Sequence, residues 1–235
     1  MKQLNYASLQ GLAKNTTSNK SINAEDSASV LLSLLDYNSN LEEFLRKANC
    51  YDAANTIISE NNWILRRRNT TTKEQISEGC VFRTDFGNAY IGECSYVHYS
   101  LCVRLYNDKA LVVPMTSNEN QINKAFHPRE NESGEYKLRR GLRSEGFIDD
   151  CAMFMNDVKF ISFGRIIKAL PAIDNTALIS IQEQLYSIIF PTFSKQLKRY
   201  KTNEAYLQQY IEDLEYENQK LHIELGVLKS QKNEG

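Results

Sequence analysis

Apolar side chains recur every three or four positions near the start of the chain. Two sets show this spacing: Val30, Leu31, Leu34 and Leu35, and then Leu41, Phe44, Leu45 and Ala48. The spacing is that of an amphipathic α-helix. Because residues 24–67 contain neither proline nor glycine, we predict two or three helices there. Asn40, followed by Glu43, also fits a capping box and predicts a helix start at Asn40.

The segments on either side of these helices are polar. Residues 1–20 are rich in Asn, Ser and Thr, and we expect them to be frayed. Residues 66–75 are charged and polar, so we predict a connection there and a boundary near residue 72, which makes 1–72 an N-terminal helical region. The arginines at 66–68 have two interpretations, an RNA contact or a solvated helix end.

Short β-rich runs separated by glycine and proline fill residues 76–170. The runs are CVFRTDF, SLCVRLY, ALVVPMT, EYKLRR, CAMFMND and VKFISFGRI. They predict a small, strongly bent antiparallel sheet or barrel, with a hairpin turn at Asn107 and Asp108. A helix is predicted from about residue 174, with a break at Pro191. We assign sheet and helix together to one domain, residues 73–192.

Leucines repeat every seven residues in the remaining segment, 193–235. Leu207, Leu214, Leu221 and Leu228 take d positions, and Ile211, Asn218 and Leu225 take a positions. Leucine at d, with one Asn among apolar a residues, favours a parallel two-stranded coiled coil. We therefore expect a leucine zipper between two copies of the chain. The alternative is a single amphipathic helix that folds back on its own domain.

Charge and cysteine content exclude several classes of protein. The formal net charge is −1, so no global basic field indicates a DNA partner. The basic cluster KQLKRYK at 195–201 suggests a DNA-reading basic region, but Pro191 and an apolar helix precede it. The five cysteines form no Cys-x-x-Cys motif. They predict reduced thiols, with neither a disulfide framework nor a zinc site, and we expect no cofactor.

No targeting or membrane segment is evident in the sequence. The first 20 residues lack the apolar core of a signal peptide, and no apolar run approaches the roughly 18 residues of a membrane span. We therefore expect a cytoplasmic protein without membrane contact.

A series of short motifs runs through residues 78–117. In order they are Gly79, Asp85-Phe86-Gly87, Gly92-Glu93, His98-Tyr99 and Pro114-Met115-Thr116-Ser117. This series, with CAMFMNDVKFISFGRI at 151–166, resembles the MazF/PemK-like toxins, small bacterial endoribonucleases of toxin–antitoxin systems. The resemblance covers about residues 78–190. It implies an α+β protein with an SH3-like β-barrel, here flanked by the N-terminal helical region and a long C-terminal helix. It also implies a two-fold dimer through the barrel, which the coiled coil would reinforce.

The resemblance further implies a metal-independent, sequence-specific endoribonuclease that cleaves single-stranded RNA. Thr116 matches the family's catalytic threonine. His98 and Tyr99 stand where the better-known branch of the family has arginine and proline, and that arginine is a catalytic residue. Longer members with an N-terminal helical region carry His-Tyr here. Since histidine exchanges protons near neutral pH, we assign proton transfer to His98 and phosphate hydrogen bonds to Thr116 and Ser117.

RNA-binding roles follow from residue type. We predict that Tyr99 stacks on a base or supports His98, and that Arg83, Arg104 and Lys159 contact phosphates. Glu93 shapes the loop or forms a surface ion pair. The expected partners are single-stranded RNA, chiefly mRNA, and an antitoxin that is a protein or an RNA.

Several alternatives stay open at the sequence level. His98 also fits a hydrogen-bonded structural histidine, and the barrel then becomes an inert module that binds RNA or protein. A nucleophilic pair of His98 with Cys94 or Cys102 is a further alternative, although no acid or oxyanion motif accompanies it. His127, in FHPRE, is expected to be a loop residue because Pro128 favours an extended turn.

Overall fold

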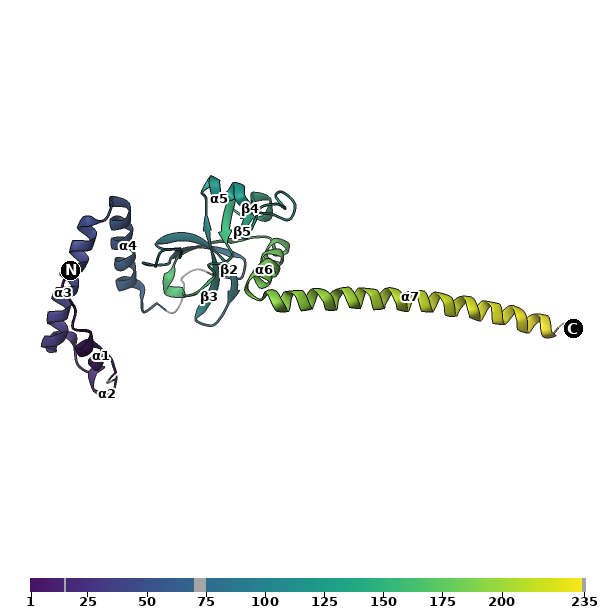
Figure 1. Ribbon diagram of the computed structural model, residues 1–235, viewed down its shortest axis with the longest axis horizontal. Coiled ribbons are helices and arrows are strands. Elements are labelled where there is room, and N and C mark those ends of the chain that lie inside the picture. The colour runs from purple at the N-terminus through teal and green to yellow at the C-terminus, as the bar shows by residue number, and fades with distance from the viewer. Residues whose placement is uncertain (15, 70–74, 234–235) are drawn as a thin grey trace.

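The computed structural model of the protein describes residues 1–14, 16–69 and 75–233. Helices lie at both ends of the chain and a sheet lies between them (Figure 1). The helices are α1 (Tyr6–Lys14), α2 (Thr16–Asn19), α3 (Ala28–Lys47), α4 (Cys50–Arg66), α5 (Glu119–Lys124), α6 (Asn175–Ile189) and α7 (Pro191–Asn233), with 3-10 turns η1 (Ala24–Asp26), η2 (Arg143–Glu145) and η3 (Phe163–Arg165). The chain is therefore α+β, as predicted. The boundary placed near residue 72 falls outside the described residues.

The N-terminal helices differ from the prediction in two places. Helices α3 and α4 occupy the predicted range, but α1 and α2 form where we expected a frayed segment. Asn40 does not start a helix, because the apolar repeat continues through it and α3 runs unbroken. Its side chain instead contacts the backbone of Lys2, accepting from N at 2.5 Å and donating to O at 2.8 Å.

Eight strands form one sheet. They are β1 (Cys80–Asp85), β2 (Val97–Leu105), β3 (Lys109–Thr116), β4 (Ala125–Phe126), β5 (Glu135–Gly141), β6 (Cys151–Phe154), β7 (Lys159–Ser162) and β8 (Ile166–Ala172). Their order is β4-β5-β6-β3-β2-β1-β8, and β7 pairs with the first half of β3. All pairs are antiparallel except β4 with β5. Every predicted run contains a strand, but none predicted β8 as a separate strand. Pro171 argues against a strand in the sequence, whereas β8 lies at an edge of the sheet, where proline is tolerated.

The sheet is open. Its hydrogen-bonded path ends at β4 on one side and β8 on the other, and no pairing of these two strands closes it within the described part of the chain. The closed SH3-like barrel that the resemblance implies is therefore not confirmed.

Alternating side chains divide the core between the two faces of the sheet. On one face Val81, Leu101 and Val113 pack with α6 through a cluster that includes Ile181. On the other face the cluster comprises Cys80, Phe82, Phe86, Cys102, Ala110, Val112, Ile161 and Ile166. Successive strand residues point to opposite faces of the sheet. Candidate site residues that are adjacent on a strand must therefore also lie on opposite faces.

Helix α7 extends away from the rest of the molecule (Figure 1). The break at Pro191 is confirmed, because α6 ends at Ile189 and α7 begins at Pro191. Every side chain from Lys201 to Leu225 is exposed, so the helix does not fold back on its own domain. Within the described residues, no helix has both the length and the apolar character needed to cross a bilayer.

His127 is not an ordinary loop residue. It lies just beyond β4 and is fully buried, and its backbone forms an isolated bridge with Asn131. Its Nε2 lies 3.2 Å from a carboxylate oxygen of Glu145, which also contacts Arg139. The expectation from Pro128 was wrong because long-range burial, and not the local turn, determines this position.

Candidate functional site

One end of the sheet brings together most of the residues predicted to act in chemistry. Strand β1 ends there, β2 begins there and β3 ends there, because neighbouring strands run antiparallel. The register pairs Thr84 with His98 and Tyr99 with Met115. His98 and Thr116 each lie one residue beyond the last pair of the β2–β3 register, Tyr99 with Met115, so both stand at this end of the sheet.

His98 and Tyr99 nevertheless face opposite sides of the sheet. By alternation His98 shares a face with Ser100 and Thr84, whose hydroxyl oxygens lie 2.8 Å apart and are buried. His98 is half-buried. Burial lowers the pKa of His98 below its ordinary 6.5, and a hydrogen bond with the backbone of Met115 opposes that shift. The imidazole is therefore neutral at pH 7 and suited to accept a proton.

The face that carries Tyr99 has a small cavity of about 180 Å³. Tyr99, Thr116 and Ser117 line it, together with the segment from Phe147 to Cys151. Tyr99 is 49% exposed, so its side chain is accessible to a ligand. Arg83 is the strand partner of Tyr99 and is exposed. The predicted base-stacking residue and one predicted phosphate contact therefore lie side by side.

Lys159 does not offer a free ammonium group to a phosphate. Its Nζ donates to the carbonyl oxygen of Cys94 at 3.0 Å and lies 3.4 Å from Asp157 and 3.8 Å from Glu93. These contacts hold the loop between β1 and β2. Of the two interpretations of Glu93, the structure contains the ion pair, which Glu93 forms with Lys159.

Arg104 lies apart from the site. It is near the far end of β2, six positions from His98, which corresponds to roughly 20 Å along a strand. Its guanidinium pairs with Glu78 at 3.1 Å. The structure therefore does not bring Arg104 together with the other predicted residues.

The thiols near His98 are poor nucleophiles. Burial is the main cause that raises the pKa of Cys94 to about 11, and burial likewise raises that of Cys102 to about 12. Since the thiolate is the reactive form, the alternative of a Cys–His pair loses its chemical basis. Among the described residues, no group of three His, Cys, Asp or Glu side chains is placed to hold a metal ion.

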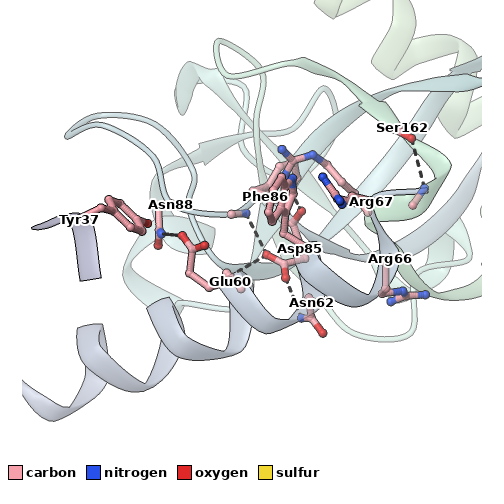
Figure 2. Close-up of a pocket in the computed structure, with 14 residues that line it drawn as sticks. Tyr37, Glu60, Asn62, Arg66, Arg67, Asp85, Phe86, Asn88 and Ser162 are labelled. Carbon is pink, nitrogen blue, oxygen red and sulfur yellow. Dashed lines mark hydrogen bonds between the residues drawn. The ribbon is translucent and has the colours of Figure 1, made fainter. Parts of the chain in front are cut away.

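Asp85 has a role that its place in the motif did not reveal. It is buried at the end of β1, and its carboxylate accepts hydrogen bonds from Ser59 Oγ at 2.8 Å, Asn62 Nδ2 at 2.7 Å and the backbone N of Gly87 at 2.9 Å. Figure 2 shows it between α4 and the loop that follows β1. Asp85 thus attaches the N-terminal helices to the end of the sheet. The helical spacing of Ser59 and Asn62 places both on one face of α4, which is the only sequence signal for this contact.

The end of α4 approaches the sheet closely at η3. Arg66 donates to the carbonyl oxygen of Ile166 at 2.7 Å. A Cβ atom at Gly164 would lie 2.7 Å from the carbonyl oxygen of Arg66, so only glycine permits this approach. The arginines at 66–68 are therefore more than a solvated helix end, because the first of them joins two parts of the chain.

Comparison with known proteins does not identify the chain. No protein-family model matches it, and no curated protein matches it either. The arrangement of its own residues is thus what supports a function.

Proposed function

We propose that the protein is a metal-independent endoribonuclease that cleaves single-stranded RNA and acts as the toxin of a toxin–antitoxin pair. The observation that carries the proposal is that one end of the sheet gathers His98 at the start of β2 and Thr116 at the end of β3, where Thr116 lines a small cavity with Tyr99 and Ser117. A proton acceptor, two hydroxyl donors and an aromatic ring are the groups that such cleavage needs.

The proposed reaction uses the RNA's own 2′-hydroxyl. Neutral His98 accepts the 2′-OH proton, and the 2′-oxygen attacks the adjacent phosphorus. Thr116 and Ser117 donate hydrogen bonds to the phosphoryl oxygens as negative charge builds on them. The bond from phosphorus to the 5′-oxygen breaks, water protonates that oxygen, and the hydroxide formed takes the proton back from His98, leaving a 2′,3′-cyclic phosphate. The step balances without a metal ion or cofactor.

The resemblance to the MazF/PemK-like toxins supports the same proposal. In this proposal the curved sheet is an SH3-like barrel of that type that is left open between β4 and β8. Its substrate is mRNA in the cytoplasm. An antitoxin, either a protein or an RNA, would inhibit it by covering the end of the sheet that holds Tyr99 and Ser117.

The direct test is incubation of the purified protein with a long single-stranded RNA, with and without EDTA. We expect cuts at a recurring short sequence in both reactions, each leaving a 2′,3′-cyclic phosphate end. Intact RNA after incubation with folded protein would exclude the nuclease.

A second candidate is an inert module that binds RNA or protein. The observation that favours it is the half-buried position of His98 and its hydrogen bond with the backbone of Met115, which also suit a structural residue. This candidate predicts RNA binding without strand scission.

We also propose that α7 forms a parallel coiled coil with a second copy of the chain. The helix has 43 residues, and its described a and d residues Leu207, Ile211, Leu214, Leu221 and Leu225 are 41–55% exposed. An isolated helix of this kind gains stability mainly by packing its apolar stripe. Asn218 indicates that the partner helix is a second copy of the chain in parallel orientation. In a parallel, in-register pair the two Asn218 side chains meet, whereas in an antiparallel pair each would face a leucine.

Disulfide trapping should detect this coiled coil independently of any dimer formed by the sheet. In a Cys50→Ser background, which removes the exposed native thiol, we expect Leu214→Cys to form a covalent dimer on mild oxidation. Residues at a d position of a parallel pair bring their Cβ atoms within disulfide reach. The readout is a non-reducing gel. The matched control, Ile223→Cys, lies on the same helix at an outward f position, and equal cross-linking of both variants would contradict the parallel zipper.

A further inference from the structure

A cavity of about 530 Å³ lies between α4 and the end of the sheet (Figure 2). Its volume is within the usual range of about 300–1,000 Å³ for small-molecule sites. Three guanidinium groups line it: Arg66 and Arg67 from the end of α4, and Arg165 from η3. Trp63, which is 56% exposed, also lines it. None of these residues has a part in the proposed cleavage step.

The cavity carries three guanidinium groups that pair with no carboxylate in the part of the chain that the structure describes. Among the described residues, no Asp or Glu oxygen forms an ion pair with any of the three arginines. The two carboxylates in the wall are engaged by uncharged donors. Glu60 accepts from Asn88 Nδ2 at 2.8 Å, and Asp85 accepts from Ser59, Asn62 and Gly87. Among the described residues of its lining, the cavity therefore has more cationic than anionic side chains.

Two of the three arginines, Arg66 and Arg165, are each held by a backbone contact that leaves other N–H groups for a ligand. Arg66 donates to the carbonyl oxygen of Ile166 at 2.7 Å, and Arg165 donates to that of Asp85 at 3.0 Å. Each contact uses one of the five N–H groups of a guanidinium and fixes the position of the rest. Planar groups held in this way match the paired oxygens of a phosphate.

Trp63 adds an aromatic surface beside the cations. The guanidinium carbon of Arg67 lies 5.1 Å from the centre of the Trp63 ring. Aromatic rings and arginine planes are the usual platforms on which unpaired bases stack. Phosphate donors and a stacking surface thus occur in one cavity, which is the combination that a nucleotide requires.

We propose that this cavity binds a nucleotide of single-stranded RNA, with its phosphate on Arg66, Arg67 and Arg165 and its base beside Trp63. The identity of the ligand as an RNA strand rests on the proposed function. The position of the cavity agrees with an RNA ligand, because Asp85 in its wall directly follows Thr84, which is the strand partner of His98. A strand held here passes the end of the sheet where cleavage is proposed. The N-terminal helical region then extends the RNA-binding surface.

The test measures binding of a short fluorescent single-stranded RNA to full-length His98→Ala protein, which separates binding from cleavage. Adding both Arg67→Gln and Arg165→Gln should raise Kd about 100-fold, since each charged hydrogen bond contributes roughly a factor of ten. The slope of log Kd against log salt should fall by about 0.7 for each phosphate that the variant no longer binds. Circular dichroism of the variants confirms that they are folded.

The matched control is Arg68→Gln, which removes the same kind of charge from an exposed neighbour that does not line the cavity. It should leave Kd within about twofold, the change expected from removing one screened surface charge. Equal weakening by Arg68→Gln, or no weakening by the double variant, would overturn the proposal. A parallel titration with a nucleoside 5′-monophosphate distinguishes the source of the phosphate: if the double variant loses only that ligand, the cavity binds a free nucleotide and not RNA. Failure of the wild type to cleave would count against the nuclease alone.

Discussion

Replacing His98 with alanine should lower the rate of RNA cleavage by about 10²–10⁴-fold, the usual contribution of a positioned acid–base group. The imidazole is neutral at pH 7 because burial lowers its pKa, and it lies one residue beyond the last β2–β3 pair, as Thr116 does on β3. Thr116→Ala should cost about 10²-fold, since it removes one donor to the phosphoryl oxygens and leaves the proton acceptor in place. Single-turnover cleavage of one labelled RNA measures both variants.

The pH profile separates a catalytic His98 from a structural one. Protonation removes its function as a base, and its pKa lies below 6.5. Wild-type cleavage should therefore hold steady near neutral pH and decline only as the pH falls below 6.5, while the residual rate of His98→Ala should lack this decline. His222→Ala, an exposed histidine on α7, is the matched control and should retain full activity. An unchanged rate in His98→Ala would remove His98 from the cleavage step and leave it as a structural residue.

Local patterns were sufficient for the longer helices and for most strands, but they did not predict α1 or α2. The apolar repeat at three- and four-residue spacing predicted the range of α3 and α4, because the amphipathic face of a helix is visible in its own sequence. Pro191 likewise marked the break before α7, since proline lacks the donor that a continuing helix needs. The hairpin turn between β2 and β3 was also correct, with Tyr106 N donating to Lys109 O at 2.8 Å.

Contacts between distant segments were beyond such patterns. Lys159 was assigned to phosphate by its charge alone, yet it pairs with Asp157 and Glu93. His98 and Tyr99 were grouped as one motif, although strand alternation sends them to opposite faces. The attachment of α4 through Asp85 depends on residues 23 and 26 positions apart in the chain. Only the folded chain shows which of several polar residues meet.

A buried ionic cluster is the largest feature that the sequence did not reveal. Arg139 on β5 and His127 beyond β4 are fully buried, and both contact the same carboxylate oxygen of Glu145 on η2, at 3.0 and 3.2 Å. The other oxygen of Glu145 accepts from the backbone N of Leu142 at 3.2 Å. Arg139 also donates to the carbonyl oxygen of Arg140. The cluster therefore joins three segments at the β4–β5–β6 edge of the sheet.

Glu145→Gln should lower the free energy of unfolding by about 3–5 kcal/mol, because it leaves the Arg139 charge buried without its partner. The change keeps the side chain's size, so poorer packing cannot explain the result. Urea unfolding followed by circular dichroism is the measurement, with the midpoint falling and the slope unchanged. Asp149→Asn breaks the exposed pair of Asp149 with Arg143 and should leave the midpoint where it is. Equal shifts in both variants would refute a special role for the buried cluster.

The same cluster makes stability depend on pH. Nδ1 of His127 accepts from the backbone N–H groups of Arg129 and Glu130, at 3.2 and 2.9 Å, so the neutral ring carries its proton on Nε2 and donates it to Glu145. Protonating Nδ1 would break both contacts, and burial is the main cause that lowers the pKa of His127 below 6.5. The unfolded chain then binds more protons than the folded one below pH 6.5, and stability must fall as the pH drops through that range.

The urea midpoint should be constant from neutral pH down to about 6.5 and decline below it. In His127→Gln, which keeps a buried amide in place of the titrating ring, this decline should shrink; a decline of undiminished size would place its origin in other groups, half-buried His98 among them.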